Sequence, residues 1–178
     1  YDAAFAEVAA VIQSRNQLQT EVLRPVGTRT AEGLKSVKYA MYDDGHAELT
    51  KQLTPVLTDL FEGQLYIMKF LGAYAEADYE RATAELQDSA RKLEALLPRV
   101  EDADHKSDLA QALADLRTYT DTFAAIHELV LKQHDTIDGT LNVLGPQIID
   151  NQHQIQESLV TSAAEIADKA KAEVLMAE

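Results

Sequence analysis

The sequence of 178 residues contains no cysteine and no tryptophan. Without cysteine, the chain can form no disulfide scaffold, no thiolate zinc site, no c-type haem attachment and no thiol nucleophile. It also contains no apolar run of about 18 residues, the length of a membrane span, and we expect no signal peptide within it. If the parent protein has either feature, we expect this chain to be an excised soluble piece of it.

Glycine and proline are scarce, at 7 and 4 residues, and the chain shows no period-two stretch and no Asn-Gly hairpin signal. Apolar residues instead recur at intervals of three and four, which is typical of bundled helices. This spacing predicts helices over residues 3–44, 47–74, 78–100 and 107–144, with a further helical stretch after residue 146.

The predicted fold class is all-α. We expect an elongated antiparallel four-helix bundle with long first and last helices, kinked at Pro25 and at Gly145-Pro146. The alternative is six helices in two stacked bundle modules, which would form if both interruptions were turns. We also expect Asp78 to cap the third helix and residues 101–106 to form a polar turn.

The chain is strongly acidic, with a formal net charge of −14. Such a surface repels nucleic acid and anionic lipid head groups, so we expect no nucleic-acid partner. The charge is uneven, because residues 1–42 carry a net charge of +1 and residues 43–178 carry −15.

Cations cluster in the first predicted helix, at Arg24, Arg29, Lys35 and Lys38. The last two share one outer helical face with Tyr39 and Tyr42. Cations and phenols together suit a partner interface or an anion site, and the alternative is an ordinary solvated face.

Several polar residues occupy positions of the predicted apolar seams: Arg15, Gln19, Arg29, Thr120, His127 and His134. A buried arginine needs a carboxylate, contact with water or an anionic ligand, because an unpaired buried charge is costly. The alternative is an arginine whose charged end reaches solvent.

Motifs for enzyme chemistry are missing: there is no phosphate-binding loop, no His-Glu-x-x-His pair and no nucleophile elbow. The best metal candidates are two Asp-x-x-His steps, Asp102/His105 and Asp150/His153. They match the di-iron pattern poorly, because the acid is the shorter Asp and no inward Glu stands out on the first two helices. We therefore expect no enzymatic activity, no cofactor and no metal.

Three stretches carry a family resemblance: Leu65-Tyr-Ile-Met-Lys-Phe-Leu-Gly-Ala-Tyr, Asp78-Tyr-Glu-Arg-Ala and Leu141-Asn-Val-Leu-Gly-Pro-Gln-Ile-Ile-Asp. From Leu65 onward the chain resembles the extracytoplasmic sensor domain of bacterial methyl-accepting chemotaxis proteins. These are the four-helix-bundle and helical bimodular sensors, which also occur on some histidine kinases.

The resemblance implies a single sensor domain over residues 1–178, with residues 1–24 and 147–178 as a candidate membrane-proximal module. It implies the periplasmic portion of an inner-membrane chemoreceptor that works as a homodimer in chemotaxis signal transduction. The chain would touch the membrane only through flanking spans outside it. Alternatives are a histidine-kinase sensor, a structural adaptor coiled coil and a metal-carrying bundle.

In such receptors a small ligand, often a carboxylate or an amino acid, binds near the dimer interface. By position, Arg24 and Arg29 resemble the arginines that contact its anionic group, and Thr120 and His127 resemble the residues that contact the rest. With two residues of the outer cationic face, the expected ligand-binding set is Arg24, Arg29, Lys38, Tyr39, Thr120 and His127.

Overall fold

The computed structural model describes the backbone of residues 2–176 and the side chains of residues 3–140 and 142–164. The elements are α1 (Asp2–Gln17), η1 (Leu18–Leu23), α2 (Arg24–Asp43), α3 (Ala47–Ala73), α4 (Glu76–Leu96), η2 (Leu97–Arg99), α5 (Ala103–Thr136), η3 (Ile137–Leu141) and α6 (Asn142–Met176). No strand occurs among residues 2–176, so the all-α prediction is confirmed.

The chain divides into two compact units. Residues 10–132 form one unit, and the described parts of residues 1–9 and 133–178 form the other.

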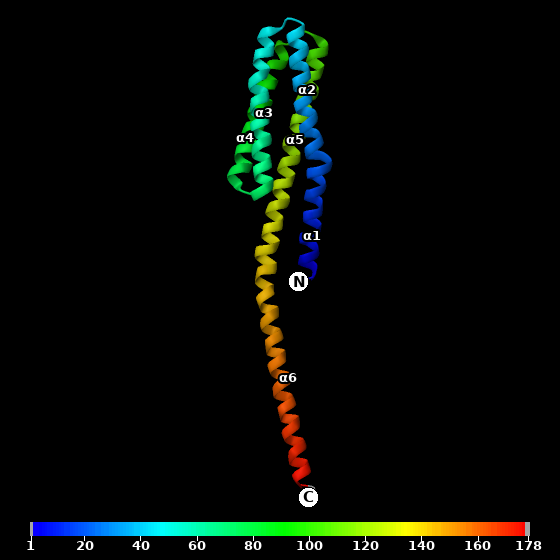
Figure 1. Ribbon diagram of the computed structural model, residues 1–178, viewed down its shortest axis with the longest axis vertical. Coiled ribbons are helices and arrows are strands. Elements are labelled where there is room, and N and C mark those ends of the chain that lie inside the picture. The colour runs from blue at the N-terminus through cyan, green and yellow to red at the C-terminus, as the bar shows by residue number, and fades with distance from the viewer. Residues whose placement is uncertain (1, 177–178) are drawn as a thin grey trace. The chain divides into compact units, whose positions relative to one another are not determined.

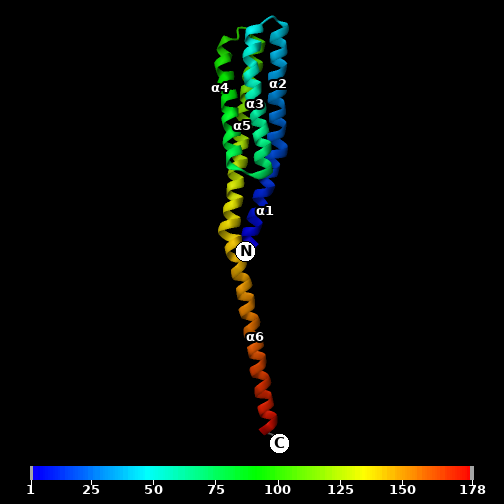
Figure 2. The ribbon, with the colours of Figure 1, turned by 60° about the vertical axis from the view of Figure 1, so that its left-hand side comes forward.

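In the unit of residues 10–132, α2, α3, α4 and α5 run alongside one another (Figures 1 and 2). All four contribute to one apolar core. Its largest fully buried side chains are Leu34, Met41, Leu53, Leu60, Phe70, Leu86, Leu93, Leu109, Leu116 and Phe123. Burying one such side chain stabilises the fold by about 1.5–3 kcal/mol, so this core is the main support of the four helices.

The helix α2 ends at the sequence Asp43-Asp44-Gly45. Gly45 adopts a φ of 84°, a left-handed conformation that glycine takes without steric cost and that ends a helix. The amide of His46 then donates to the carbonyl of Met41 at 2.8 Å, which closes the turn into α3.

Two predicted boundaries are wrong. The N-cap of α4 is Ala75, and Asp78 lies in the first turn of the helix. A carboxylate in that turn stabilises the helix by its favourable interaction with the helix dipole. The polar turn predicted at residues 101–106 is shorter, because α5 already begins at Ala103. The Asp102 carboxylate accepts a hydrogen bond from the His105 amide at 2.8 Å, and this bond holds the Asp102 pKa below its usual value.

The predicted interruptions of the first helix and of the stretch after residue 144 are both helical in the structure. Pro25 lies at the start of α2, directly after the π-helical segment η1. Pro146 lies inside α6. A proline removes one backbone donor, and a wider π-turn beside it is one way to accommodate that loss.

In the other unit, α6 exposes several large apolar side chains: Val143, Ile148, Ile149, Ile155, Leu159 and Val160. No helix in the described part of the chain is both long enough and apolar enough to cross a membrane.

Candidate functional site

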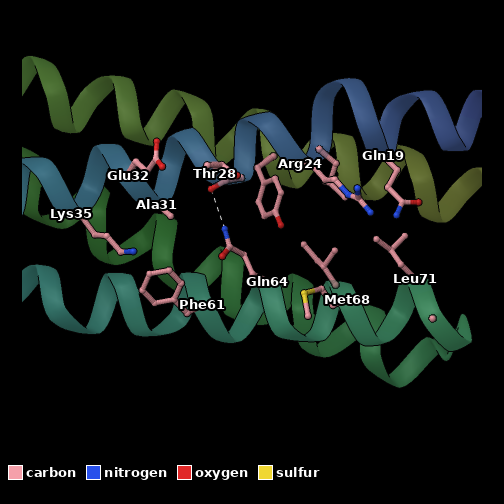
Figure 3. A pocket seen from close by; sticks show the side chains of 15 residues that line it. Gln19, Arg24, Thr28, Ala31, Glu32, Lys35, Phe61, Gln64, Met68 and Leu71 are labelled. Atoms are coloured by element: carbon pink, nitrogen blue, oxygen red, sulfur yellow. Dashed lines mark hydrogen bonds between the residues drawn. The ribbon is translucent and has the colours of Figure 1, made fainter.

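The candidate site is a groove of about 800 Å³ between α2 and α3, inside the unit of residues 10–132 (Figure 3). This volume lies in the range of about 300–1,000 Å³ that small-molecule sites occupy. The walls come from η1, from α2 and from α3, and Tyr119 of α5 contributes as well.

Helical periodicity places the wall residues. On α2, the residues Arg24, Thr28, Ala31 and Lys35 follow one another at intervals of four, three and four, so they share one face. On α3, the residues Phe61, Gln64, Met68 and Leu71 follow at intervals of three, four and three. Two ordinary helices therefore present two rows of side chains to each other.

Tyr119 reaches the groove because Gly27 has no side chain. A Cβ atom at Gly27 would lie 2.7 Å from Cε2 and 3.2 Å from the hydroxyl oxygen of Tyr119. Tyr119 is only 5% exposed, and this burial raises its pKa to about 12. The phenol is therefore a neutral hydrogen-bond donor at physiological pH.

Gln64 connects the two walls. Its Nε2 donates to the carbonyl of Gly27 at 3.1 Å, the bond drawn across the groove in Figure 3. This bond fixes α3 against α2 at the same level as Tyr119.

The groove carries two cations and one carboxylate. Arg24 forms no ion pair with any residue whose side chain the structure describes. Lys35 lies over the ring of Phe61, with Nζ 5.1 Å from the ring centroid. The Glu32 carboxylate points away from α3 in Figure 3. The side of the groove that faces α3 is therefore positive, in a chain whose net charge is −14.

Arg29, the second arginine predicted to contact the ligand, lies outside the groove. Arg29 binds Asp115 of α5 through two hydrogen bonds, Nε to Oδ2 and Nη2 to Oδ1, each 2.8 Å long. This guanidinium holds the pKa of Asp115 below its usual value. Arg29 therefore has its own carboxylate and does not line the groove.

The other four predicted residues also lie outside the groove. Tyr39 is exposed and Lys38 is half-buried. The hydroxyl of Thr120 donates to the carbonyl of Leu116 at 2.9 Å. The structure thus places only Arg24 of the predicted set in the groove.

His127 belongs to a cluster of aromatic rings in the core. It stacks on Tyr79 with a centroid distance of 3.6 Å and an interplanar angle of 6°. Its Nε2 lies 2.9 Å from Oε2 of Glu76, and Phe70 and Phe123 complete the cluster.

Two other polar seam residues have defined surroundings. The Arg15 guanidinium lies over the ring of Tyr74, 5.2 Å from its centroid. Gln19 lines the groove near Arg24 (Figure 3).

Sequence reasoning missed Tyr119, Gly27, Gln64 and Met68. The one local signal was a glycine inside a predicted helix, which often marks a close approach of another group.

No group of three or more histidine, aspartate or glutamate side chains that could hold a metal ion occurs within the described residues. Comparison with protein-family models, curated proteins and solved structures gives no match to this chain.

Proposed function

We propose that this chain is the periplasmic ligand-sensing domain of a transmembrane chemoreceptor of an inner membrane. It binds a small organic anion in the groove between α2 and α3 and carries out no enzymatic step. The observation that supports this proposal is Arg24, which has no ion-pair partner among the described side chains and lines a groove of about 800 Å³. An arginine without a carboxylate partner suits the anionic group of a ligand.

The proposal includes the finer architecture expected from the sequence, an elongated antiparallel four-helix bundle with kinked first and last helices that pairs with a second copy. A ligand that contacts both α2 and α3 favours one spacing of these helices over others. Shifts of about 1–2 Å between packed helices are sufficient for signalling, provided that the ligand binds the two arrangements with different affinity.

A sensor domain of a histidine kinase would use the same groove, whereas a structural adaptor would have no use for it. The sequence of the full-length gene product distinguishes a receptor from an adaptor. A receptor requires an apolar span on each side of this chain and a long cytoplasmic heptad region, and an adaptor requires neither.

Ligand-dependent thermal stability tests the proposal. Small organic anions at 100 times their Kd should stabilise the domain by about 2.7 kcal/mol, a rise in Tm of roughly 5–10 °C. Neutral sugars should give no such rise. Arg24→Ala should abolish the shift, because the anion loses its counter-charge.

Arg91→Ala is the matched control, because Arg91 lies on α4 and pairs with Asp88 outside the groove. It should retain the full shift. Equal shifts with sugars, or an unchanged shift in Arg24→Ala, would contradict the proposal.

A further inference from the structure

We infer that the groove selects amphipathic carboxylates, whose carboxylate binds Arg24 and the Tyr119 hydroxyl together while their hydrocarbon body lies on the apolar residues of α3. This inference rests on the proposed function and adds the chemical class of the ligand. It depends on three features of the groove: an unsatisfied donor, an exposed apolar wall and the distance between the two cations.

The unsatisfied donor is the hydroxyl of Tyr119. Although 95% of this residue is buried, no described residue forms a hydrogen bond with its hydroxyl. The hydroxyl oxygen itself is not among the buried side-chain atoms that lack a partner, so it opens to the groove and is free to donate to solvent or to a ligand. Because Tyr119 lines the groove, a partner can reach it from there.

Arg24 and Tyr119 can share one carboxylate. The edge of the Tyr119 ring lies against Gly27, and Gly27 is three positions after Arg24 on the same helix. Residues three apart are neighbours on a helix surface, with about 5–6 Å between Cβ positions. A carboxylate has two oxygens and can therefore accept from the guanidinium and from the phenol at once.

The apolar wall belongs to α3. Met68 is 68% exposed and Phe61 is 40% exposed, and both line the groove with Leu71 (Figure 3). Large apolar side chains that gather in a groove mark a surface that is covered in the bound state. Methionine is flexible and polarisable, so Met68 can adapt to the shape of a ring or a branched chain.

The distance between the cations argues against a short diacid. Arg24 and Lys35 are eleven positions apart, so their Cα atoms are separated by about 16 Å along the helix. The carboxyl carbons of a four-carbon diacid are only about 4 Å apart. Succinate therefore reaches one cation and leaves its second carboxylate against the apolar wall, where an unpaired charge is unfavourable.

Titration calorimetry of the whole chain with three probes tests the inference. We expect 3-phenylpropanoate to bind at least 10-fold more tightly than succinate, because its ring covers Met68. We expect 3-phenylpropanamide to bind at least 10-fold more weakly than the acid, because it lacks the charge that Arg24 recognises.

Two substitutions separate the parts of the site. Tyr119→Phe should weaken 3-phenylpropanoate by about fivefold, the effect of one lost hydrogen bond. Tyr39→Phe removes the same hydroxyl from an exposed residue outside the groove and should leave the affinity unchanged. Met68→Gln changes an exposed side chain without disturbing the core, and it should weaken the aromatic acid severalfold while sparing succinate.

The outcomes distinguish the inference from the proposed function. If no carboxylate binds, both are wrong. If carboxylates bind through Arg24 but succinate equals 3-phenylpropanoate, or if Tyr119→Phe binds as the wild type does, the inference is wrong and the sensor proposal stands.

Discussion

At the scale of single residues, the two arginines of α2 show how the fold assigns roles that the sequence leaves open. Arg24 and Arg29 lie five positions apart, so on an ideal helix they point about 140° away from each other. Arg29 meets Asp115, a residue 86 positions further along the chain, and Arg24 lines the groove. Both arginines could be predicted as candidates, but the carboxylate that neutralises one of them is brought there only by tertiary packing.

Arg29→Ala should therefore reduce stability and leave ligand binding intact. The Asp115 side chain is 9% exposed and Arg29 is 58% exposed, so the pair is only partly screened by solvent. Removing the guanidinium leaves Asp115 with one long hydrogen bond from Gln111, at 3.3 Å. We expect a lower midpoint of unfolding in urea at pH 7, because the Asp115 carboxylate loses its strongest donor.

The loss should also depend on pH. Arg29 holds the Asp115 pKa below the ordinary value of 3.8. Its contribution is therefore present above pH 3.8 and disappears as the pH falls through the folded-state pKa. The difference between wild type and Arg29→Ala should shrink in acid. If Arg29→Ala were as stable as wild type but no longer bound the ligand, Arg29 would be a ligand-binding residue, contrary to this prediction.

At the scale of secondary-structure elements, the helices could be predicted more fully than their contacts. The end of α2 at Asp43 and the start of α3 at Ala47 agree with the sequence, because glycine and apolar spacing are local signals. The predicted seam of α5 included Thr120 and His127, whereas the structure also buries Tyr119. A helix that contacts several neighbours buries a wider face than a two-position seam, and Tyr119 was missed for that reason.

Gly27→Ala tests the close contact between α2 and α5. The new methyl group would lie 2.7 Å from the Tyr119 ring, so the ring must move and the hydroxyl leaves its place in the groove. We expect a loss of about 1–3 kcal/mol of stability, as for other overpacked sites. We also expect the thermal shift caused by 3-phenylpropanoate to fall.

Gly33→Ala is the control on the same helix, because no side chain or neighbouring helix lies within 4 Å of the added Cβ. Alanine favours helix over glycine by up to about 1 kcal/mol, so this variant should be slightly more stable and should bind normally. Equal stability of the two variants would show that Tyr119 does not depend on Gly27 for its place.

At the scale of the whole molecule, composition predicted the helical class but not the groove. Scarce glycine and proline and a three-four apolar spacing are properties of the chain itself, whereas the groove exists only where α2, α3 and Tyr119 of α5 meet. The charge pattern was informative at this scale. Residues 1–42 carry a net positive charge, whereas residues 43–178 are strongly negative. The positive segment supplies Arg24 and Lys35 to the groove.

The exposed apolar side chains of α6 bear on the proposed homodimer. Ile148, Ile155 and Leu159 are separated by seven and four positions, so they form one stripe along the helix. A stripe of this kind is typical of helices that pair with another helix, and a second copy of the same chain supplies an identical stripe.

Replacing part of this stripe should separate the proposed dimer into monomers. We expect wild type at tens of micromolar to sediment with twice the 19.6 kDa mass of one chain. Ile155→Lys combined with Leu159→Lys should weaken association by roughly 100-fold or more, because each dimer loses four buried apolar side chains and gains repelling charges. Gln154→Lys combined with Thr161→Lys adds the same two charges away from the stripe and should leave the dimer intact. A wild-type chain that is monomeric throughout this range, or equal dissociation of both double variants, would remove α6 as the pairing surface.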